Sequence, residues 1–363
     1  MGETALAAVL EAPGRLTMRE FPLPEIGPDE ALLRVEMAGV CATDPAWASG
    51  KVALPAFPMI LGHEILGRIA RIGREAAARY GVKEGDRVVV EGSTRCDHCD
   101  YCISGDYHLC DNRRSYGSTV PTTVPPALWG GYSQYLYLAP GSMLHRVSEG
   151  MPAEGGVLAC AVVANGIKWV RECGQAGLGQ SVVIQGVGPQ GLACIVAAKE
   201  SGAGPVIATG LSRDRARFAL ARELGADVII DVERDDLQAR VRAATNGRMA
   251  DLVVDVTGSP PAVKASLDLV RKRGRMIQAG VTGTTTLTPL PLDTLLFREI
   301  TLQGVFAHTV TSVRAAIRVI ESRRYPLEKL VTHHYPLREA AHALRVTARE
   351  VPGEDPIKVV LTP

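Results

Sequence analysis

The sequence predicts an α/β protein of two domains, a β-rich domain and a second domain built on a doubly wound parallel sheet. The first observation is length, because 363 residues exceed what one hydrophobic core usually supports. The second is a set of short strand-like runs broken by Gly and Pro, at Ala31 to Glu36, Arg87 to Val90 and Tyr135 to Leu138. The third is an alternation of strands and helices that starts near Gly155.

The alternating part is typical of a sheet with helices on both faces, because buried apolar runs are separated by longer helical segments. The expected strands are Ser181 to Gln185, Val206 to Thr209, Val228 to Ile230, Leu252 to Val256 and Met276 to Ala279. The expected helices are Gly191 to Ser201, Ala216 to Leu224, Leu237 to Ala244 and Ala262 to Val270.

The C-terminal part of the chain departs from this alternation beyond about Phe306. A helix near Val313 to Glu321 leads to a strand-like run at Ile357 to Leu361, which we expect to rejoin the first domain. We therefore expect the first domain to comprise residues 1–155 and 306–363 and the second residues 156–305. The threonine-rich segment Thr282 to Thr288 is expected to be a loop.

Composition is that of an ordinary soluble globular protein, with 46% hydrophobic and 22% charged residues. Forty Lys and Arg residues balance 39 Asp and Glu residues, which argues against a nucleic-acid or membrane-surface partner. Neither a basic segment followed by an apolar run at the start nor an uninterrupted apolar stretch of membrane-spanning length is evident. A cytoplasmic location is therefore expected, where cysteines bind metal more often than they form disulfides.

Four of the eight cysteines form a C-x2-C-x2-C-x7-C cluster at Cys96, Cys99, Cys102 and Cys110. Four thiolates with this spacing suit one tetrahedral zinc ion, and the surrounding stretch has little apolar content to order it otherwise. The other cysteines then need an explanation. Cys41, His63 and Cys160 are the candidates for a second metal site with different chemistry.

A glycine motif stands between the first strand and the first helix of the alternating part, with Gly186, Gly188, Pro189, Gln190 and Gly191 in the pattern G-x-G-x-x-G. Gly186 would allow the tight turn, Gly188 the approach of a pyrophosphate, and Gly191 the packing of the helix on the strand. The motif in this context predicts a dinucleotide-binding Rossmann domain. The alternative is a tight turn in another kind of α/β protein.

The choice between NAD and NADP is left open by the end of the second strand. Gly210 stands where an acidic residue usually binds the adenosine ribose hydroxyls. Ser212 and Arg213 could accept a 2′-phosphate, whereas Asp214 could reach a ribose hydroxyl if the loop folds back. Exposed arginines are common, so Arg213 could equally be a solvated surface charge.

Taken together, these motifs resemble the zinc-containing medium-chain alcohol dehydrogenase family of the medium-chain dehydrogenase/reductase superfamily. The resemblance covers nearly the whole chain and rests on the Cys41-Ala42-Thr43-Asp44 turn, Gly62-His63-Glu64, the four-cysteine cluster, Cys160 and the glycine motif. It implies a GroES-like catalytic domain beside the Rossmann domain, two zinc ions per chain, NAD or NADP, and a homodimer or homotetramer. The implied reaction is reversible hydride transfer between the cofactor and an alcohol or carbonyl substrate.

Catalytic roles follow from the resemblance residue by residue. Cys41, His63 and Cys160 would hold a catalytic zinc with one open position, while the four-cysteine cluster would hold a closed structural zinc. Thr43 would pass the alcohol proton toward the nicotinamide ribose, Asp44 would hold the other nitrogen of His63, and Glu64 would lie near the metal.

Four positions depart from or extend this pattern. In many relatives a His stands three residues after the hydroxyl of the relay, but this chain has Ala46, so the proton must leave by another route. Lys358 matches a basic family position near the cofactor phosphates, with a surface lysine as the alternative. Cys173 and Cys194 are expected to bind no metal.

The prediction of the substrate rests on three aromatic residues. Trp47, Phe57 and Trp129 fall in segments that border the pocket in relatives, although such aromatics could equally be core residues. An apolar lining favours a medium-sized, uncharged secondary alcohol, cyclic ones included. The alternatives are a polyol or threonine dehydrogenase of the same family, or a zinc- and nucleotide-binding protein without turnover.

Overall fold

The computed structural model describes residues 3–283 and 286–363, so part of the threonine-rich segment predicted as a loop lies outside the described residues. The chain divides into two compact units, one of residues 1–161 with 327–363 and one of residues 162–326. These limits differ from the expected 155 and 306, chiefly because helix α11 (Val310–Glu321) belongs to the second unit. It buries Val313, Ile317 and Ile320 and packs against α5 (Asn165–Ile167) of that unit.

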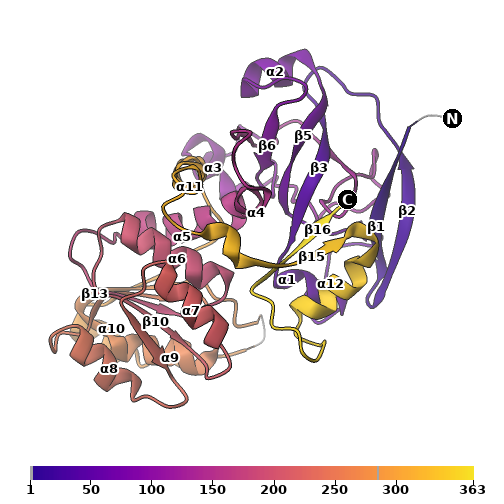
Figure 1. Cartoon of the computed structure of the whole chain (residues 1–363). Coiled ribbons are helices and arrows are strands. Elements are labelled where there is room, and N and C mark those ends of the chain that lie inside the picture. The colour runs from indigo at the N-terminus through magenta and orange to yellow at the C-terminus, as the bar shows by residue number, and fades with distance from the viewer. Residues whose placement is uncertain (1–2, 284–285) are drawn as a thin grey trace. The chain divides into compact units, whose positions relative to one another are not determined.

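The first unit is built on two sheets. The smaller has the order β2 (Arg15–Pro22), β1 (Thr4–Ala12), β4 (Met59–Ile60). The larger has the order β15 (Val331–Pro336), β16 (Lys358–Thr362), β3 (Ala31–Val40), β5 (Glu64–Ile72), β6 (Arg87–Val90), β8 (Leu144–Arg146), with β7 (Tyr135–Leu138) also paired to β3. The terminal strand β16 lies antiparallel to β3, which confirms that the tail rejoins the first domain (Figure 1).

Short helices connect the strands of the first unit. They are α1 (Thr43–Ala48), α2 (Arg74–Tyr80), α3 (Asp100–Ile103), η1 (Tyr107–Leu109), α4 (Ala153–Leu158), η4 (Leu327–Leu330), η5 (Leu337–Glu339) and α12 (Ala340–Thr347). Apolar side chains from both sheets form one core, in which Leu32, Ile60 and Tyr132 are fully buried. This arrangement is the predicted β-rich domain.

The second unit is a six-stranded parallel sheet with the order β11 (Val228–Asp231), β10 (Val206–Gly210), β9 (Val182–Gln185), β12 (Ala250–Asp255), β13 (Val270–Gln278), β14 (Thr301–Gly304). Numbered within the sheet, this is the 3-2-1-4-5-6 order of the doubly wound dinucleotide fold. The connecting helices are α6 (Pro189–Glu200), α7 (Arg215–Glu223), α8 (Leu237–Ala244), α9 (Pro260–Leu269) and α10 (Leu292–Arg298).

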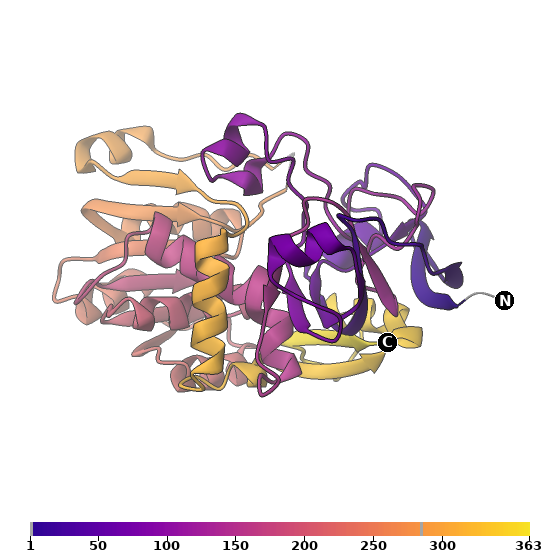
Figure 2. The ribbon, with the colours of Figure 1, turned by 90° about the horizontal axis from the view of Figure 1, so that it is seen from above.

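Helices of the second unit pack in two pairs, α6 with α7 and α8 with α9 (Figures 1 and 2). The order of the strands reverses after β11, so the helices before and after that strand cover opposite faces of the sheet. The predicted doubly wound sheet is therefore confirmed. The carboxyl ends of β9 and β12 meet beside each other at the reversal, where such folds bind ligands.

One helical run in the described part of the chain is long and apolar enough to cross a membrane, from Ala153 to Cys173. It consists of α4, the π-helical turn η2 (Ala159–Ala164), α5 and the π-helical turn η3 (Lys168–Cys173). A stretch of this kind is not evident in the sequence. However, 83% of the apolar window is buried inside the protein, which is the behaviour of a core helix.

Candidate active site and cofactor-binding loop

The four cysteines of the C-x2-C-x2-C-x7-C motif converge. The sulfur atoms of Cys96, Cys99, Cys102 and Cys110 all lie within 4.8 Å of one another. Hydrogen bonds from the backbone of His98 and the side chain of Asn112 lower the pKa of Cys96 to about 6, which favours its thiolate form. Four sulfur atoms at this separation fit one tetrahedral zinc ion, as the spacing predicted.

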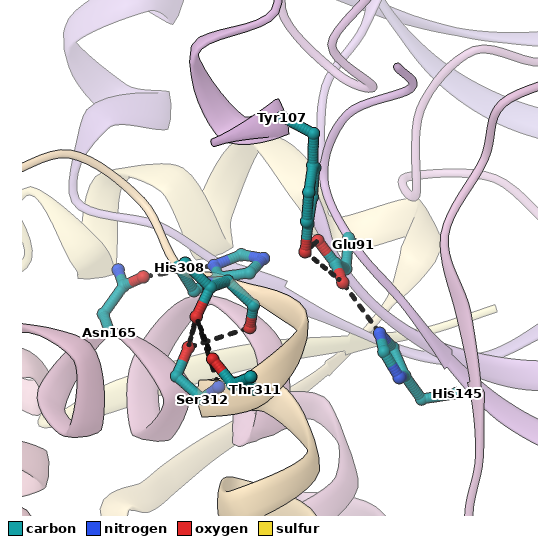
Figure 3. A network of polar contacts seen from close by, with 8 residues as sticks. Glu91, Tyr107, His145, Asn165, His308, Thr311 and Ser312 are labelled. Carbon is teal, nitrogen blue, oxygen red and sulfur yellow. Dashed lines mark hydrogen bonds and ion pairs between the residues drawn. The ribbon is translucent and has the colours of Figure 1, made fainter. Parts of the chain in front are cut away.

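A buried polar network anchors this four-cysteine lobe, residues 96–110, to the sheet (Figure 3). The hydroxyl of Tyr107 donates to both carboxylate oxygens of Glu91, at 2.9 and 3.0 Å. The Nε2 atom of His145 lies 2.7 Å from the same carboxylate. Because Glu91 directly follows β6 and His145 lies in β8, the network ties the lobe to two strands. Sequence patterns carry no signal for it.

The second cluster forms where two neighbouring strands end and begin. Strand β3 ends at Val40, β5 begins at Glu64, and their register pairs Gly39 with Glu64. Cys41 and His63, one residue beyond each strand, are thereby brought together. A ligand atom from each of Cys41, His63 and Glu64 lies within 4.8 Å of the others.

Asp44 lies on the buried side of this cluster, and its predicted hold on His63 stays a prediction. Its side chain is completely buried, and its Oδ2 accepts hydrogen bonds from the backbone N–H of Cys41 at 2.8 Å and the hydroxyl of Tyr132 at 2.7 Å. Its Oδ1 faces the Nδ1 of His63 at 3.6 Å. Burial raises the pKa of Asp44, although His63 and the hydrogen bond from Tyr132 oppose that rise.

Electrostatics at the cluster favour a bound cation. Burial of His63 disfavours its protonation, but the negative charges of Cys41 and Asp44 outweigh it and raise the pKa of His63 to about 10. The same charges would stabilise a divalent metal in contact with the thiolate and the imidazole. The residues present therefore fit a zinc ion.

Lys358 is a partner of Glu64 and not a surface lysine. Its Nζ lies 2.5 Å from the Glu64 Oε2, and both side chains are almost fully buried. Room for this carboxylate depends on Gly39, because a Cβ there would come within 2.2 Å of the Glu64 Oε2. The ion pair was not anticipated, and the assignment of Lys358 to the cofactor phosphates stays a prediction.

Cys160 lies in η2 of the first unit and is buried. Burial, together with the negative charges of Glu91 and Glu64, raises the pKa of its thiol well above the ordinary value. Its sulfur is not among the ligand atoms that lie mutually within 4.8 Å. Its role as the third ligand therefore stays a prediction. Cys194 is fully buried in α6, as expected of a core thiol, and Cys173 is half-buried.

Helix α1 carries the side chains predicted for the proton relay and the pocket. Thr43, its first residue, is exposed, and Ala46 supplies no protic group. The Trp47 ring lies edge-on to His63 with 5.7 Å between ring centroids, so this indole borders the metal cluster.

The other two aromatics predicted for the pocket lie in or on the core. Phe57 is half-buried and packs against the hydrophobic core of the first unit. Trp129 is almost fully buried between Tyr116 and Tyr137, and its indole N–H donates to the Val124 carbonyl. This burial favours the alternative of a core residue, and its assignment to a substrate pocket stays a prediction.

The glycine motif adopts the predicted turn between β9 and α6. Gly186 has φ +104°, which favours glycine, and a Cβ at Gly191 would lie 1.9 Å from the Gly186 carbonyl oxygen. A Cβ at Gly188 would meet nothing within 4 Å, so the chain leaves open space there. Pro189 occupies the first turn of α6, whose N-terminal N–H groups and Gln190 border that space. The loop fits a pyrophosphate.

The loop after β10 is organised by carboxylates. Gly210 has no room for a side chain, because a Cβ would clash with Val187 and Phe218. The hydroxyl of Ser212 donates to Asp231 at 2.6 Å and its backbone N–H donates to Glu233 at 2.8 Å.

The two charged residues that follow Ser212 differ in exposure. Arg213 is exposed to solvent. Asp214 is buried, accepts from the Leu211 N–H and pairs with Arg217 at 3.0 Å, so it is committed to the turn and does not reach toward a ribose.

Comparisons with known proteins agree with this geometry. Residues 27–149 match the family described as alcohol dehydrogenase GroES-like domain, and residues 189–322 match the family described as zinc-binding dehydrogenase. A probable alcohol dehydrogenase of Mycobacterium tuberculosis is 40% identical over 368 residues, covering 100% of this chain and 99% of that protein. An erythritol/L-threitol dehydrogenase of Mycolicibacterium smegmatis is 32% identical over 383 residues, which cover 99% of this chain and 98% of that protein. The crystal structure of an alcohol dehydrogenase from Thermotoga maritima superposes with a TM-score of 0.91 at 31% identity and covers 100% of both chains.

Proposed function

Because the chain belongs to the zinc-containing medium-chain dehydrogenase/reductase family and is an oxidoreductase, we propose that it catalyses reversible hydride transfer between NAD and an alcohol at a zinc site of Cys41, His63 and Cys160. The observation that carries the proposal is the convergence of Cys41, His63 and Glu64 within 4.8 Å beside an exposed threonine hydroxyl. A purely nucleotide-binding protein has no need of such a cluster.

Chemistry at this site divides between the bound groups and the side chains. When bound, zinc supplies Lewis acidity to an alcohol or carbonyl oxygen, and the dinucleotide supplies a hydride acceptor or donor. Thr43 accepts the alcohol proton and hands it to solvent, since its hydroxyl is exposed and Ala46 offers no further acceptor. Asp44 holds His63 in orientation, and Lys358 neutralises Glu64.

The proposed substrate is a medium-sized apolar secondary alcohol, cyclic ones included. Trp47 supports this choice, because its half-buried indole borders His63 and presents an apolar surface to whatever binds there. A polyol would find few hydrogen-bond partners on that side.

We propose NAD as the preferred cofactor. Ser212, one of the two residues able to receive a 2′-phosphate, already donates both of its hydrogen bonds to Asp231 and Glu233. A phosphate there would approach two carboxylates, whereas ribose hydroxyls would find acceptors. The expected ratio of kcat/KM for NAD over NADP is at least about tenfold. Asp231→Asn should lower the ratio, and a preference for NADP would instead restore Arg213 as a phosphate-binding residue.

Self-association of this chain is proposed through the outer edge of the second unit. Leu292, Leu296 and Phe297 of α10 are largely exposed, and β14 is an edge strand of the sheet. Exposed apolar residues beside an unpaired strand edge favour an isologous dimer. Light scattering should report a dimer or tetramer that Phe297→Glu weakens, and a wild-type monomer would contradict the proposal.

The deciding experiment couples metal analysis to cofactor reduction across a panel of alcohols. Fully loaded protein should contain two zinc ions per chain and reduce NAD with apolar secondary alcohols. Fewer than two zinc ions would break the assignment. Turnover restricted to polyols or threonine would move the chain to another branch of the family, and full metal loading without turnover would indicate a binding protein.

A further inference from the structure

A tyrosine far from the cluster in sequence lies directly behind it. Tyr132 is fully buried, and its hydroxyl donates to the Oδ2 of Asp44, 88 residues away, at 2.7 Å. The ring packs against Gly62, the residue before His63, so closely that a Cβ on Gly62 would come within 2.5 Å of it. One side chain therefore contacts both the support of His63 and the backbone that leads into it.

The two oxygens of Asp44 have separate partners. Oδ2 accepts hydrogen bonds from the Cys41 N–H and from Tyr132, whereas Oδ1 faces the Nδ1 of His63 at 3.6 Å, the separation of an ion pair and not of a hydrogen bond. The Cys41 N–H belongs to the same turn as Asp44, whereas Tyr132 is the contact that comes from a distant segment. A buried carboxylate that loses a hydrogen-bond donor is destabilised by its uncompensated desolvation, or it rotates toward another donor.

The orientation of His63 follows from that of Asp44. The Nδ1 of His63 faces this carboxylate at 3.6 Å, an ion-pair separation, so a carboxylate fixed in this position favours a ring orientation that leaves the other nitrogen, Nε2, for a metal. Rotation of the Asp44 carboxylate would release the imidazole from that position.

We propose that Tyr132 is a positioning residue of the zinc site, which fixes the Asp44 carboxylate and through it the His63 ring. This inference rests on the proposed function, since it requires zinc at Cys41 and His63. In this arrangement His63 contacts the metal, Asp44 supports His63, and the Tyr132 hydroxyl supports Asp44, so the tyrosine affects how tightly the metal is bound.

Tyr116 provides a matched control. It is as deeply buried in the same core, and its hydroxyl bonds Ser142 at 2.6 Å and accepts from the Ala139 N–H at 3.2 Å. Neither partner contacts Cys41, His63 or Glu64 through any hydrogen bond found in the described residues. Loss of this hydroxyl therefore removes comparable buried bonds without touching the metal cluster.

The experiment compares Tyr132→Phe and Tyr116→Phe in the full-length chain. Zinc is first loaded to saturation, and its release to a chelator is followed together with the absorption spectrum of the cobalt-substituted site and the melting temperature. Tyr132→Phe should release one of its two metals about 10 to 100-fold more readily and shift the cobalt spectrum, as for other groups that support a ligand. Tyr116→Phe should leave both unchanged. Equal metal release from the two variants would overturn the proposal.

A double-mutant cycle with Asp44→Asn tests the route of the effect. If Tyr132 acts through Asp44, Tyr132→Phe should add no more than about twofold to metal release in the Asp44→Asn background. Independent, multiplying effects would show that Tyr132 acts by packing alone and would reject the proposal. If the wild-type protein binds a metal only at the four-cysteine lobe, the proposed function itself is rejected. If all variants bind two metals and release them equally, only the role of Tyr132 is rejected.

Discussion

The four-cysteine lobe and the Cys41 cluster are both suited to zinc, but they are built in different ways. All four donors of the lobe come from residues 96–110, in a stretch held by a short helix and a 3-10 turn. Donors of the other cluster come from the ends of two strands, and Asp44, Tyr132 and Lys358 support them from separate segments. We therefore expect the order of the lobe to depend on a bound metal, whereas the two paired strands place the donors of the cluster without one.

Loss of a lobe cysteine should give the largest effect. Cys99→Ser should abolish metal binding by the lobe and lower the melting temperature strongly. The reason is that binding of a structural zinc contributes on the order of 10 kcal/mol to the folding free energy of the segment that holds it. Limited proteolysis should then cut between residues 96 and 110. An intact lobe that resists protease without metal would contradict this account.

Removal of a donor from the open cluster should affect activity more than folding. His63→Ala should lower kcat/KM for alcohol oxidation by at least about 1,000-fold, since the Lewis acid contributes several kcal/mol to the barrier. One zinc should remain per chain, and the melting temperature should fall less than in Cys99→Ser, because Asp44 loses its ion-pair partner but keeps its hydrogen bonds from Cys41 and Tyr132. Equal losses of stability in His63→Ala and Cys99→Ser would erase the distinction between the two sites.

The buried ion pair beside the cluster should matter for stability. Lys358→Met leaves the Glu64 carboxylate buried without its partner, which should cost about 3–5 kcal/mol in the free energy of unfolding in urea. The double variant Glu64→Gln with Lys358→Met serves as the control and should recover much of that loss. No recovery would show that Lys358 acts through other contacts.

Loss of the hydrogen bonds between the lobe and the sheet should have a smaller effect on stability. Tyr107→Phe removes the hydroxyl that donates to Glu91 and should cost about 1.5–3 kcal/mol, the range for hydrogen bonds to charged groups. Proteolysis within the lobe should become faster while both metals stay bound. Metal loss from the lobe in this variant would mean that docking and metal binding are one event.

Restoration of a proton acceptor should have the smallest effect. Ala46→His should raise alcohol oxidation by less than about tenfold and add an ionisation to its pH profile, because Thr43 is proposed to pass protons to solvent already. An unchanged pH profile would count against a relay that ends at Thr43.

Much of the fold could be predicted because periodicity is a local property. The bounds of β6, β7 and α8 are those expected from the sequence, and the order of strands and helices from β9 to β13 is correct. Strand β3 runs four residues longer than predicted, to Val40, because it is buried on both faces near its end and loses the alternation that marks a strand.

The candidate site was predictable only as far as spacing and family motifs reach. The lobe cysteines follow from spacing, and Cys41, His63, Asp44 and Glu64 follow from motifs. Tyr132 could not be predicted, since its contact with Asp44 is set by the packing of segments 88 residues apart. The choice between pocket and core for Trp129 could not be made from the sequence for the same reason, because burial of an aromatic depends on its tertiary neighbours and not on its own segment.

Gly39 shows how far the demands of the site extend into the scaffold. A central strand would ordinarily gain from a β-branched residue, and a protein engineer seeking thermal stability would choose this position early. Here the missing side chain is the space in which the Glu64 carboxylate meets Lys358. The chemistry of the active site thus dictates the choice of residue within the strand, and stabilising substitutions must be sought in strands that border no charge.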